Sequence, residues 1–387
     1  AGTGGFVING QAARDHSGLS VSSAGDVNGD GLTDLIIGSP YSRSTAGQEA
    51  GRSYVVFGQS TSTAINLASI VGSSGGFVVN GESALDRSGW SVACAGDVNS
   101  DGLSDLAIGA PLATNSAGTN AGRSYVVFGK NTTTPTELSA IAVNDGGFVI
   151  NSQAINERIF SVASTGDVNG DGLADLIIGA SWSDPAAGPF GGRSYVVFGK
   201  ANPASINLSD VATGVGGFVI NIIGPAASEL SGCSVASAGD VNGDGFADLI
   251  VGADWSESAA GRYAGQSYVV FGKSNISAIE LSAITAGSDG FVINGQSTFD
   301  HSGRSIASAG DVNGDGLSDL IVGAPYSDPN AGSYAGRSYV VFGKTSFSAI
   351  DLSAITTGAG GFVINGQCGG DVSGLSVSSA GDVNGDG

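Results

Sequence analysis

The chain repeats a unit of about 71 residues, and this repeat constrains its fold more than any other feature. The most regular part of the first copy reads DVNGDGLTDL over residues 26–35, with Gly25 before it and two isoleucines after it. The surrounding sequence recurs in phase, with the first aspartate at Asp26, Asp97, Asp167, Asp240, Asp311 and Asp382. Such a unit buries its apolar surface against its neighbours. The chain is therefore expected to fold as an array of similar packed units.

Each unit contains four short runs that are typical of β-strands. In the first copy these are GGFVING, which ends at residue 10, SGLSVSSAGD (17–26), LIIGSP (35–40) and GRSYVVFG (51–58). Turn residues separate the runs, and AINLASI (64–70) closes the unit with one expected helical turn. Longer helices are not expected, because no long segment has apolar residues at i, i+3, i+4 and i+7. Four strands per unit predict an all-β fold, a β-propeller of four-stranded blades, whereas a β-solenoid has much shorter repeats.

The unit boundaries predict one β-propeller domain over residues 1–387, or a fragment of a longer one. Five units are complete, and a sixth ends inside its own aspartate-rich loop; the approximate ranges are 5–75, 76–146, 147–216, 217–289, 290–360 and, for the partial unit, 361–387. Residues 1–10 could supply the outer strand of a last blade, but that blade would lack its two middle strands and leave exposed edges. We therefore expect that these residues belong to a longer chain; the alternative is that a neighbouring molecule supplies the missing strands.

The aspartate-rich loop has the spacing of a site for a hard divalent cation. Counted from Asp26, side-chain oxygens stand at positions 1, 3, 5 and 9, in Asp26, Asn28, Asp30 and Asp34. Glycine at position 6 permits a sharp turn, and the carbonyl of Leu32 at position 7 can point inward. Calcium takes six to eight oxygen ligands, including carboxylates and carbonyls, whereas Mg²⁺ demands a stricter octahedron. The loop therefore predicts a Ca²⁺ site.

Four further copies carry the same ligand set, so we expect one Ca²⁺ in each of five complete repeats. The corresponding residues are Asp97, Asn99, Asp101, Leu103 and Asp105; Asp167, Asn169, Asp171, Leu173 and Asp175; Asp240, Asn242, Asp244, Phe246 and Asp248; and Asp311, Asn313, Asp315, Leu317 and Asp319. The sixth copy keeps Asp382, Asn384 and Asp386 without the closing acid, so we expect it to hold metal poorly.

Two other interpretations of the loop fit its sequence less well. Asp and Asn also shape turns without metal, but turn chemistry does not require an acid at positions 1, 5 and 9 in every complete copy. The first positions are shared with the helix-flanked Ca²⁺ loop, yet the bidentate Glu at its twelfth position is replaced here by Ile37, inside a strand. The pattern therefore indicates a β-hairpin version of the site.

The charge balance agrees with a cation-binding chain. It has 35 acidic and 14 basic residues and a formal net charge of −21, which argues against nucleic acid and anionic membrane surfaces as partners. No run of 18 apolar residues is present, so no membrane insertion is expected. Clustered carboxylates repel one another unless a cation lies among them, so the bound ions should stabilise the native state.

The repeat resembles the FG-GAP repeat of integrin alpha-subunit propellers and their bacterial relatives. The resemblance rests on SGLSVSSAGDVNGDGLTDLIIGSP and its sister copies and covers essentially the whole chain. Gly-Ala-Pro is intact at 109–111 and 323–325, whereas Ser-Gly at 17–18 and equivalent positions stands where the family has Phe-Gly. The resemblance implies a propeller with Ca²⁺ held in loops between the first and second strands of each blade. Loops whose extracellular versions bind Ca²⁺ at roughly 10⁻⁴–10⁻³ M suit the millimolar Ca²⁺ outside cells, so an extracellular or cell-surface location is expected.

The face opposite these loops is the expected place for a partner. It should gather loops such as QAARDHSG (11–18) and SPYSRSTAGQEAG (39–51). Aromatic residues recur in the second kind of loop, at Tyr41, Trp182, Trp255 and Tyr326, with Leu112 in the remaining copy. They either pack over the strand tips within each blade or recognise a ligand. The partner is expected to be a protein, a glycan or another copy of the chain.

A recurrent basic residue opens the GRSYVVFG strand. It is present as Arg52, Arg123, Arg193 and Arg337, and Gln266 replaces it in the fourth copy. A base in the same slot of four repeats predicts an ion pair or a carbonyl contact within the blade.

Little in the sequence points to catalysis. The chain has two histidines, His16 and His301, and no nucleophile motif, phosphate loop or zinc spacing. We therefore expect a non-enzymatic, secreted or cell-surface, calcium-binding module for adhesion or for surface assembly as a layer or filament. The alternative is the propeller domain of a secreted hydrolase, such as a phosphodiesterase or phospholipase-like enzyme. Acids or histidines that break the repeat symmetry and converge on the opposite face would favour that alternative.

Overall fold

The computed structural model describes residues 5–59, 63–70, 72, 75–184, 190–221, 229–272, 277–329, 331–346 and 348–381. The chain divides into two compact units. One comprises Ala1–Ser164, Leu173–Leu176 and Phe198–Gly216, and the other comprises Thr165–Gly172, Ile177–Val197 and Gly217–Gly387.

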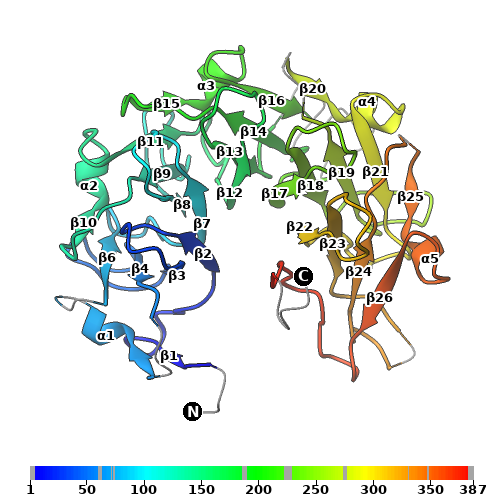
Figure 1. Ribbon diagram of the computed structural model, residues 1–387, viewed down its shortest axis with the longest axis horizontal. Helices are drawn as coiled ribbons and strands as arrows, with labels where there is room; N and C mark the ends of the chain where they lie inside the picture. The colour runs from blue at the N-terminus through cyan, green and yellow to red at the C-terminus, as the bar shows by residue number, and fades with distance from the viewer. Residues whose placement is uncertain are drawn as a thin grey trace. The chain divides into compact units, whose positions relative to one another are not determined.

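The first unit contains two blades of the expected kind (Figure 1). In each, four antiparallel strands lie in chain order, and a two-residue strand from the following repeat pairs in parallel with the outermost strand. The first blade contains β2 (Val21–Gly25), β3 (Asp34–Ser39), β4 (Arg52–Val56) and β6 (Gly76–Asn80), extended by β10 (Thr136–Glu137). The second contains β7 (Ser91–Gly96), β8 (Asp105–Ala110), β9 (Arg123–Val127) and β11 (Gly147–Asn151), extended by β15 (Ile206–Asn207).

The second unit contains two blades with the same strand order. One contains β17 (Ser234–Gly239), β18 (Asp248–Ala253), β19 (Gln266–Val270) and β21 (Gly290–Asn294), extended by β25 (Ile350–Asp351). The other contains β22 (Ser305–Gly310), β23 (Asp319–Ala324), β24 (Arg337–Val341) and β26 (Gly361–Asn365). A further sheet of the same order has residues in both units; its strands are β12 (Ser161–Gly166), β13 (Asp175–Ala180), β14 (Arg193–Val197), β16 (Gly217–Asn221) and β20 (Ile279–Glu280).

The expected helical turn is present near the end of each complete repeat. In α1 (Leu67–Ile70), the apolar residues Leu67 and Ile70 are buried and pack against Tyr54 and Val56 of β4. The other turns are α2 (Leu138–Ile141), α3 (Leu208–Val211), α4 (Leu281–Thr285) and α5 (Leu352–Ile355). In the part of the chain that the structure describes, no helix is long and apolar enough to cross a membrane.

The outer strand of each blade comes from the next copy of the sequence repeat. The GGFVVN run that opens the second copy forms β6, which pairs with β4 of the first. Within the described residues, the equivalent run at the start of the chain contributes β1 (Ile8–Asn9), which pairs with β5 (Ile65–Asn66) and not with the third strand of a blade. Blade boundaries are therefore shifted by one strand from the boundaries of the sequence repeat.

Each blade is apolar on both faces, because alternate side chains of a strand point to opposite sides. In the first blade, Ile36 and Val55 pack against the second blade, in a cluster with Leu106 and Tyr125. The adjacent Ile37 packs on the other side of the sheet. Burying one large apolar side chain contributes about 1.5–3 kcal/mol, so inter-blade packing dominates the stability of each unit.

A β-bulge lies at the start of the aspartate-rich loop. The register of β2 against β3 shifts between Ser23 and Gly25, and Gly25 opposes Asp34 with a φ of 70°. The same shift recurs in β7, β17 and β22. A glycine at this position allows the positive φ and sets the direction in which the loop leaves the sheet.

We expect Gly76→Ala to lower the free energy of unfolding by about 2 kcal/mol or more. Gly76 has a φ of 149°, and a Cβ there would lie 2.0 Å from the Val55 carbonyl oxygen of the paired strand. Gly5, the equivalent residue of the first copy, has no atom within 4 Å of an added Cβ, so Gly5→Ala is the matched control. Chemical denaturation measures both variants, and equal stability of the two would contradict this account.

Candidate metal centre

The aspartate-rich loop of the first blade joins β2 to β3 and is ordered by its own side chains. Asp26 Oδ1 accepts hydrogen bonds from the amides of Gly29 and Asp30, at 2.7 and 3.1 Å, and Asp26 Oδ2 accepts one from Gly31 at 2.9 Å. Asp30 Oδ1 accepts from the amide of Leu32 at 2.8 Å. These side chains hold the loop in a tight turn because each satisfies amides two to five residues further along.

The ninth position of the loop is a buried anchor. Asp34 has no exposed surface. Its Oδ2 accepts from the Val27 amide at 2.9 Å, and its Oδ1 accepts from the Gly58 amide at 2.8 Å. One carboxylate therefore holds the loop to the start of β3 and to the chain that leaves β4.

The same anchor is present in three other copies. Asp105 accepts from the amides of Val98 and Gly129, Asp248 from Val241 and Gly272, and Asp319 from Val312 and Gly343, all between 2.8 and 3.0 Å. In the third copy, Asp167 accepts from the amides of Gly170, Asp171 and Gly172, and Asp175 accepts from that of Gly199. Asp382, Asn384 and Asp386 of the sixth loop lie outside the described residues.

The surroundings of the buried aspartates raise the pKa values of their carboxyl groups. Burial raises the pKa of Asp105 to about 7, and the nearby carboxylates of Asp101 and Asp97 add to the rise, while the two amide hydrogen bonds oppose it. Asp248 is raised to about 7 for the same reasons. The pKa values of Asp34 and Asp319 are also raised, with burial as the largest cause. A nearby cation would favour the charged carboxylates and so lower these pKa values.

The predicted ligands lie on one loop, but their side chains are not arranged as a metal-binding cluster. Among the described residues, no group of three or more His, Cys, Asp or Glu side chains is placed to hold a metal ion. Asp26 and Asp30 are at or near the surface, and Asp34 is buried beneath them. The donor set is made of oxygen alone, and this chemistry fits Ca²⁺. Asp26, Asn28, Asp30, Asp34 and the Leu32 carbonyl remain the residues predicted to hold it, together with their counterparts.

The loops also connect consecutive blades. The carbonyl of Asp26 accepts from the Ser104 amide of the next loop at 2.9 Å, and the Val27 carbonyl accepts from the Lys130 amide at 2.9 Å. In the second unit, Asp240 and Ser318 make the equivalent contact at 2.8 Å. The sequence prediction missed the contacts of the Ser104, Lys130 and Gly58 amides. The Phe-Gly that recurs at the end of GRSYVVFG was the available signal for the Gly58 contact.

The opposite end of the blades gathers the two kinds of loop that the sequence placed there. Gly51, at the end of the β3–β4 loop, forms a parallel bridge with Ser88, in the connection from β6 to β7. Tyr41 of the same β3–β4 loop has ring centroids 4.6 Å from His16 and 6.3 Å from Trp90. In this blade the recurrent aromatic residue therefore packs against neighbouring loops.

Arg123 makes the expected ion pair, whereas Arg52 and Arg337 donate to glutamine side chains. Arg123 Nη1 donates to Glu82 Oε2 at 2.6 Å, which is an ion pair, and Tyr125 donates to the same oxygen at 2.5 Å. Arg52 and Arg337 donate through the same nitrogen to Gln11 and Gln296, at 2.9 and 2.7 Å.

The chain was compared with known families and proteins. A model of the FG-GAP repeat matches residues 17–56, 88–127, 160–197, 234–270 and 302–341. The chain is 32% identical over 182 residues to integrin alpha-5 of Xenopus laevis, covering 45% of this chain and 16% of that protein. It is 29% identical over 255 residues to integrin alpha-PS2 of Drosophila melanogaster, covering 62% and 16%. It is 27% identical over 199 residues to phosphatidylinositol-glycan-specific phospholipase D of Bos taurus, covering 50% and 22%. It thus spans less than a quarter of each of these relatives.

We expect Asp86→Asn to gain stability relative to the unchanged chain as the pH rises from about 4 to about 6. Burial raises the pKa of Asp86 to about 6, and the Glu82 charge adds to the rise. A carboxyl group whose folded-state pKa is raised stabilises the fold most below its unfolded pKa, and this stabilisation is lost as the pH rises through the folded value. The difference in free energy of unfolding should be measured across this range, with exposed Asp145→Asn as control. If the stability of Asp86→Asn relative to the unchanged chain falls as the pH rises through this range, the raised pKa of Asp86 is contradicted.

Proposed function

Because this chain belongs to the FG-GAP repeat family, we propose that it is a calcium-binding β-propeller module that acts outside the cell or at the cell surface. Its role in this proposal is adhesion or surface assembly, as a layer or a filament, without catalysis by the chain itself.

The observation that supports the proposal is the recurrence of one loop chemistry. Oxygen side chains stand at the same four positions in five complete copies, and position 9 is a buried aspartate in each. Every such loop adds three carboxylates to a chain of net charge −21. Five Ca²⁺ ions would bring the formal net charge to about −11 and relieve repulsion within each loop.

Bound calcium would supply positive charge where the loop carboxylates repel each other. The chain's own residues supply the rest: the position 9 aspartate anchors the loop to the sheet, and the loop carbonyls accept amides of the next blade. A loop that is held more firmly also holds two blades together more firmly. Ion binding is therefore expected to be linked to the stability of the whole unit.

The proposed location and role follow from two considerations. Loops of this kind in extracellular modules bind Ca²⁺ at about 10⁻⁴–10⁻³ M. The similarity to integrin alpha chains favours an adhesion role. The similarity to phospholipase D favours the alternative, in which a propeller accompanies a hydrolase acting on phosphodiesters. We assign any such catalysis to a separate domain, because this chain has none of the motifs of a hydrolase.

Calcium at about 10 mM should stabilise the protein by roughly 1.4–2.7 kcal/mol for each occupied site, since this is about 10–100 times the expected dissociation constant. Thermal melting in Ca²⁺, in Mg²⁺ and in excess chelator measures the effect. Asp101→Ala and Asp244→Ala, at position 5 of two loops, should each remove part of the increment that Ca²⁺ produces.

The exposed acid Asp145 lies outside the loops, so Asp145→Ala is the control for a general charge effect. A melting temperature that is the same in Ca²⁺ and in chelator would refute the metal assignment.

Electron microscopy should distinguish the two proposed roles. An adhesion module is expected as separate particles, whereas an assembly unit is expected as regular end-to-end strings or sheets whose formation depends on protein concentration. Strings that persist at high dilution would argue against a purely adhesive role.

A further inference from the structure

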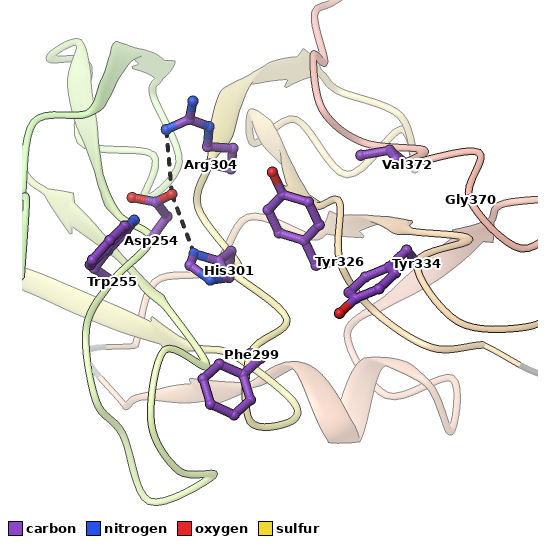
Figure 2. A pocket seen from close by; sticks show the side chains of 9 residues that line it. All are labelled: Asp254, Trp255, Phe299, His301, Arg304, Tyr326, Tyr334, Gly370 and Val372. Atoms are coloured by element: carbon purple, nitrogen blue, oxygen red, sulfur yellow. Dashed lines mark ion pairs between the residues drawn. The ribbon is translucent and has the colours of Figure 1, made fainter.

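The second unit contains a pocket of about 640 Å³ that the aspartate-rich loops do not explain (Figure 2). It lies beyond the ends of β18 and β23 and includes residues of the connection from β21 to β22. Each aspartate-rich loop enters β18 or β23 at the opposite end, so the pocket is on the other face. Its volume is within the range of about 300–1,000 Å³ that is usual for small-molecule sites.

Aromatic side chains form the wall of the pocket. Trp255 and Tyr334 are 38% and 56% exposed, and Phe299 and Tyr326 are also exposed. The Tyr326 ring centroid lies 6.0 Å from that of Tyr334 and 5.2 Å from that of His301. Several exposed rings in contact are typical of a recognition surface, because soluble proteins rarely leave such a surface open without use.

A buried carboxylate forms the base of the pocket. Asp254 is 1% exposed. Its Oδ2 lies 3.6 Å from His301 Nδ1 and 3.5 Å from Arg304 Nη1, and Figure 2 shows this oxygen between the two side chains. Both distances exceed those of a strong charge-assisted hydrogen bond. Asp254 Oδ1 and His301 Nδ1 are buried and have no hydrogen-bond partner among the described residues. Buried polar atoms normally have partners, so these atoms leave hydrogen bonds for a ligand or water to make.

These polar residues break the repeat. Asp254 stands where other copies have Pro40, Pro111, Ser181 and Pro325. Arg304 stands where they have Leu19, Trp90, Phe160, Cys233 and Leu375. A feature that serves the fold is expected in every copy, whereas this combination occurs in one place. An acid and a histidine that converge on this face are the feature expected of the hydrolase alternative, and they mark the pocket as a functional site that the sequence could not locate.

The chemistry of the pocket favours a ligand that is both apolar and rich in hydroxyl groups. Asp254 already faces two basic side chains, so an additional ammonium group is not required for charge balance. Arg304 is already paired with Asp254, so the pocket offers no uncompensated positive charge to an anionic ligand. A sugar ring presents an apolar C–H face to an aromatic wall and hydroxyl groups that can both donate and accept. We propose that this pocket binds a neutral carbohydrate, with Trp255 as the stacking wall and Asp254, His301 and Arg304 as hydrogen-bonding groups.

The pocket is equipped to bind a carbohydrate rather than to cleave it. Most glycoside hydrolases use a pair of carboxyl groups on either side of the scissile bond. Asp254 is the one carboxylate among the described residues that line the pocket. The inference deepens the proposed function by naming the partner class of the module, and it does not depend on the calcium assignment.

The test uses the full chain in calcium and five probes, the methyl glycosides of glucose, galactose, mannose, N-acetylglucosamine and fucose. Saturation-transfer NMR detects binding, and titration gives the dissociation constant. We expect at least one probe to bind, and Trp255→Ala and Asp254→Asn each to weaken it about tenfold or more. Tyr334→Ala should also weaken binding, and because Tyr334 is more than half exposed, this variant is expected to fold normally.

The matched control is Trp182→Ala. Trp182 occupies the equivalent position of the preceding copy and has nearly the same exposure, but it does not line this pocket. Its substitution should leave the affinity within about twofold.

Failure of all five sugars to bind would overturn the proposal, as would binding that Trp255→Ala and Asp254→Asn leave unchanged. Displacement of the bound sugar by tetramethylammonium or inorganic phosphate, or hydrolysis of an oligosaccharide, would also overturn it. Melting in calcium tests the module separately, so failure of one proposal is distinguishable from failure of the other.

Discussion

The structure depends on the fact that each sheet is apolar on both faces. Ile36 and Ile37 are adjacent in β3 and both buried, yet they belong to clusters on opposite sides of the sheet. A single four-stranded sheet of this kind would expose a whole apolar face to water, and so it is stable only when packed between other sheets. This requirement explains why the chain repeats one unit.

Buried carboxylates connect this packing to the loops. Asp34 and its counterparts accept amides from the loop and from the chain that follows the third strand, so one side chain holds three segments. The loop in turn holds the next blade through the Asp26 carbonyl. Burial raises the pKa of this carboxylate, and the nearby acids of its loop add to the rise. The same residue thus supports the fold and would be stabilised in its charged form by a cation.

The two ends of the blades differ in how strictly their loops repeat. At one end the loops are nearly identical from copy to copy, as expected of a structural ion site. At the other end the loops differ, and the pocket around Asp254 arises where several departures from the repeat coincide. A regular scaffold with variable loops at one end is a common way to carry a binding site, because the scaffold fixes the loop ends while the loop residues change.

The sequence by itself determined the repeat, the four strands of each unit, the helical turn and the positions of the loop acids. All of these are local or periodic properties that can be read from neighbouring residues. The tertiary structure alone decided that the outer strand of a blade comes from the next copy, that Asp34 reaches Gly58, and that Asp254, His301 and Arg304 meet. These contacts join residues far apart in the chain, and they exist only because sheet pairing brings the loop ends together. The third occurs in one copy, so no periodic pattern could reveal it.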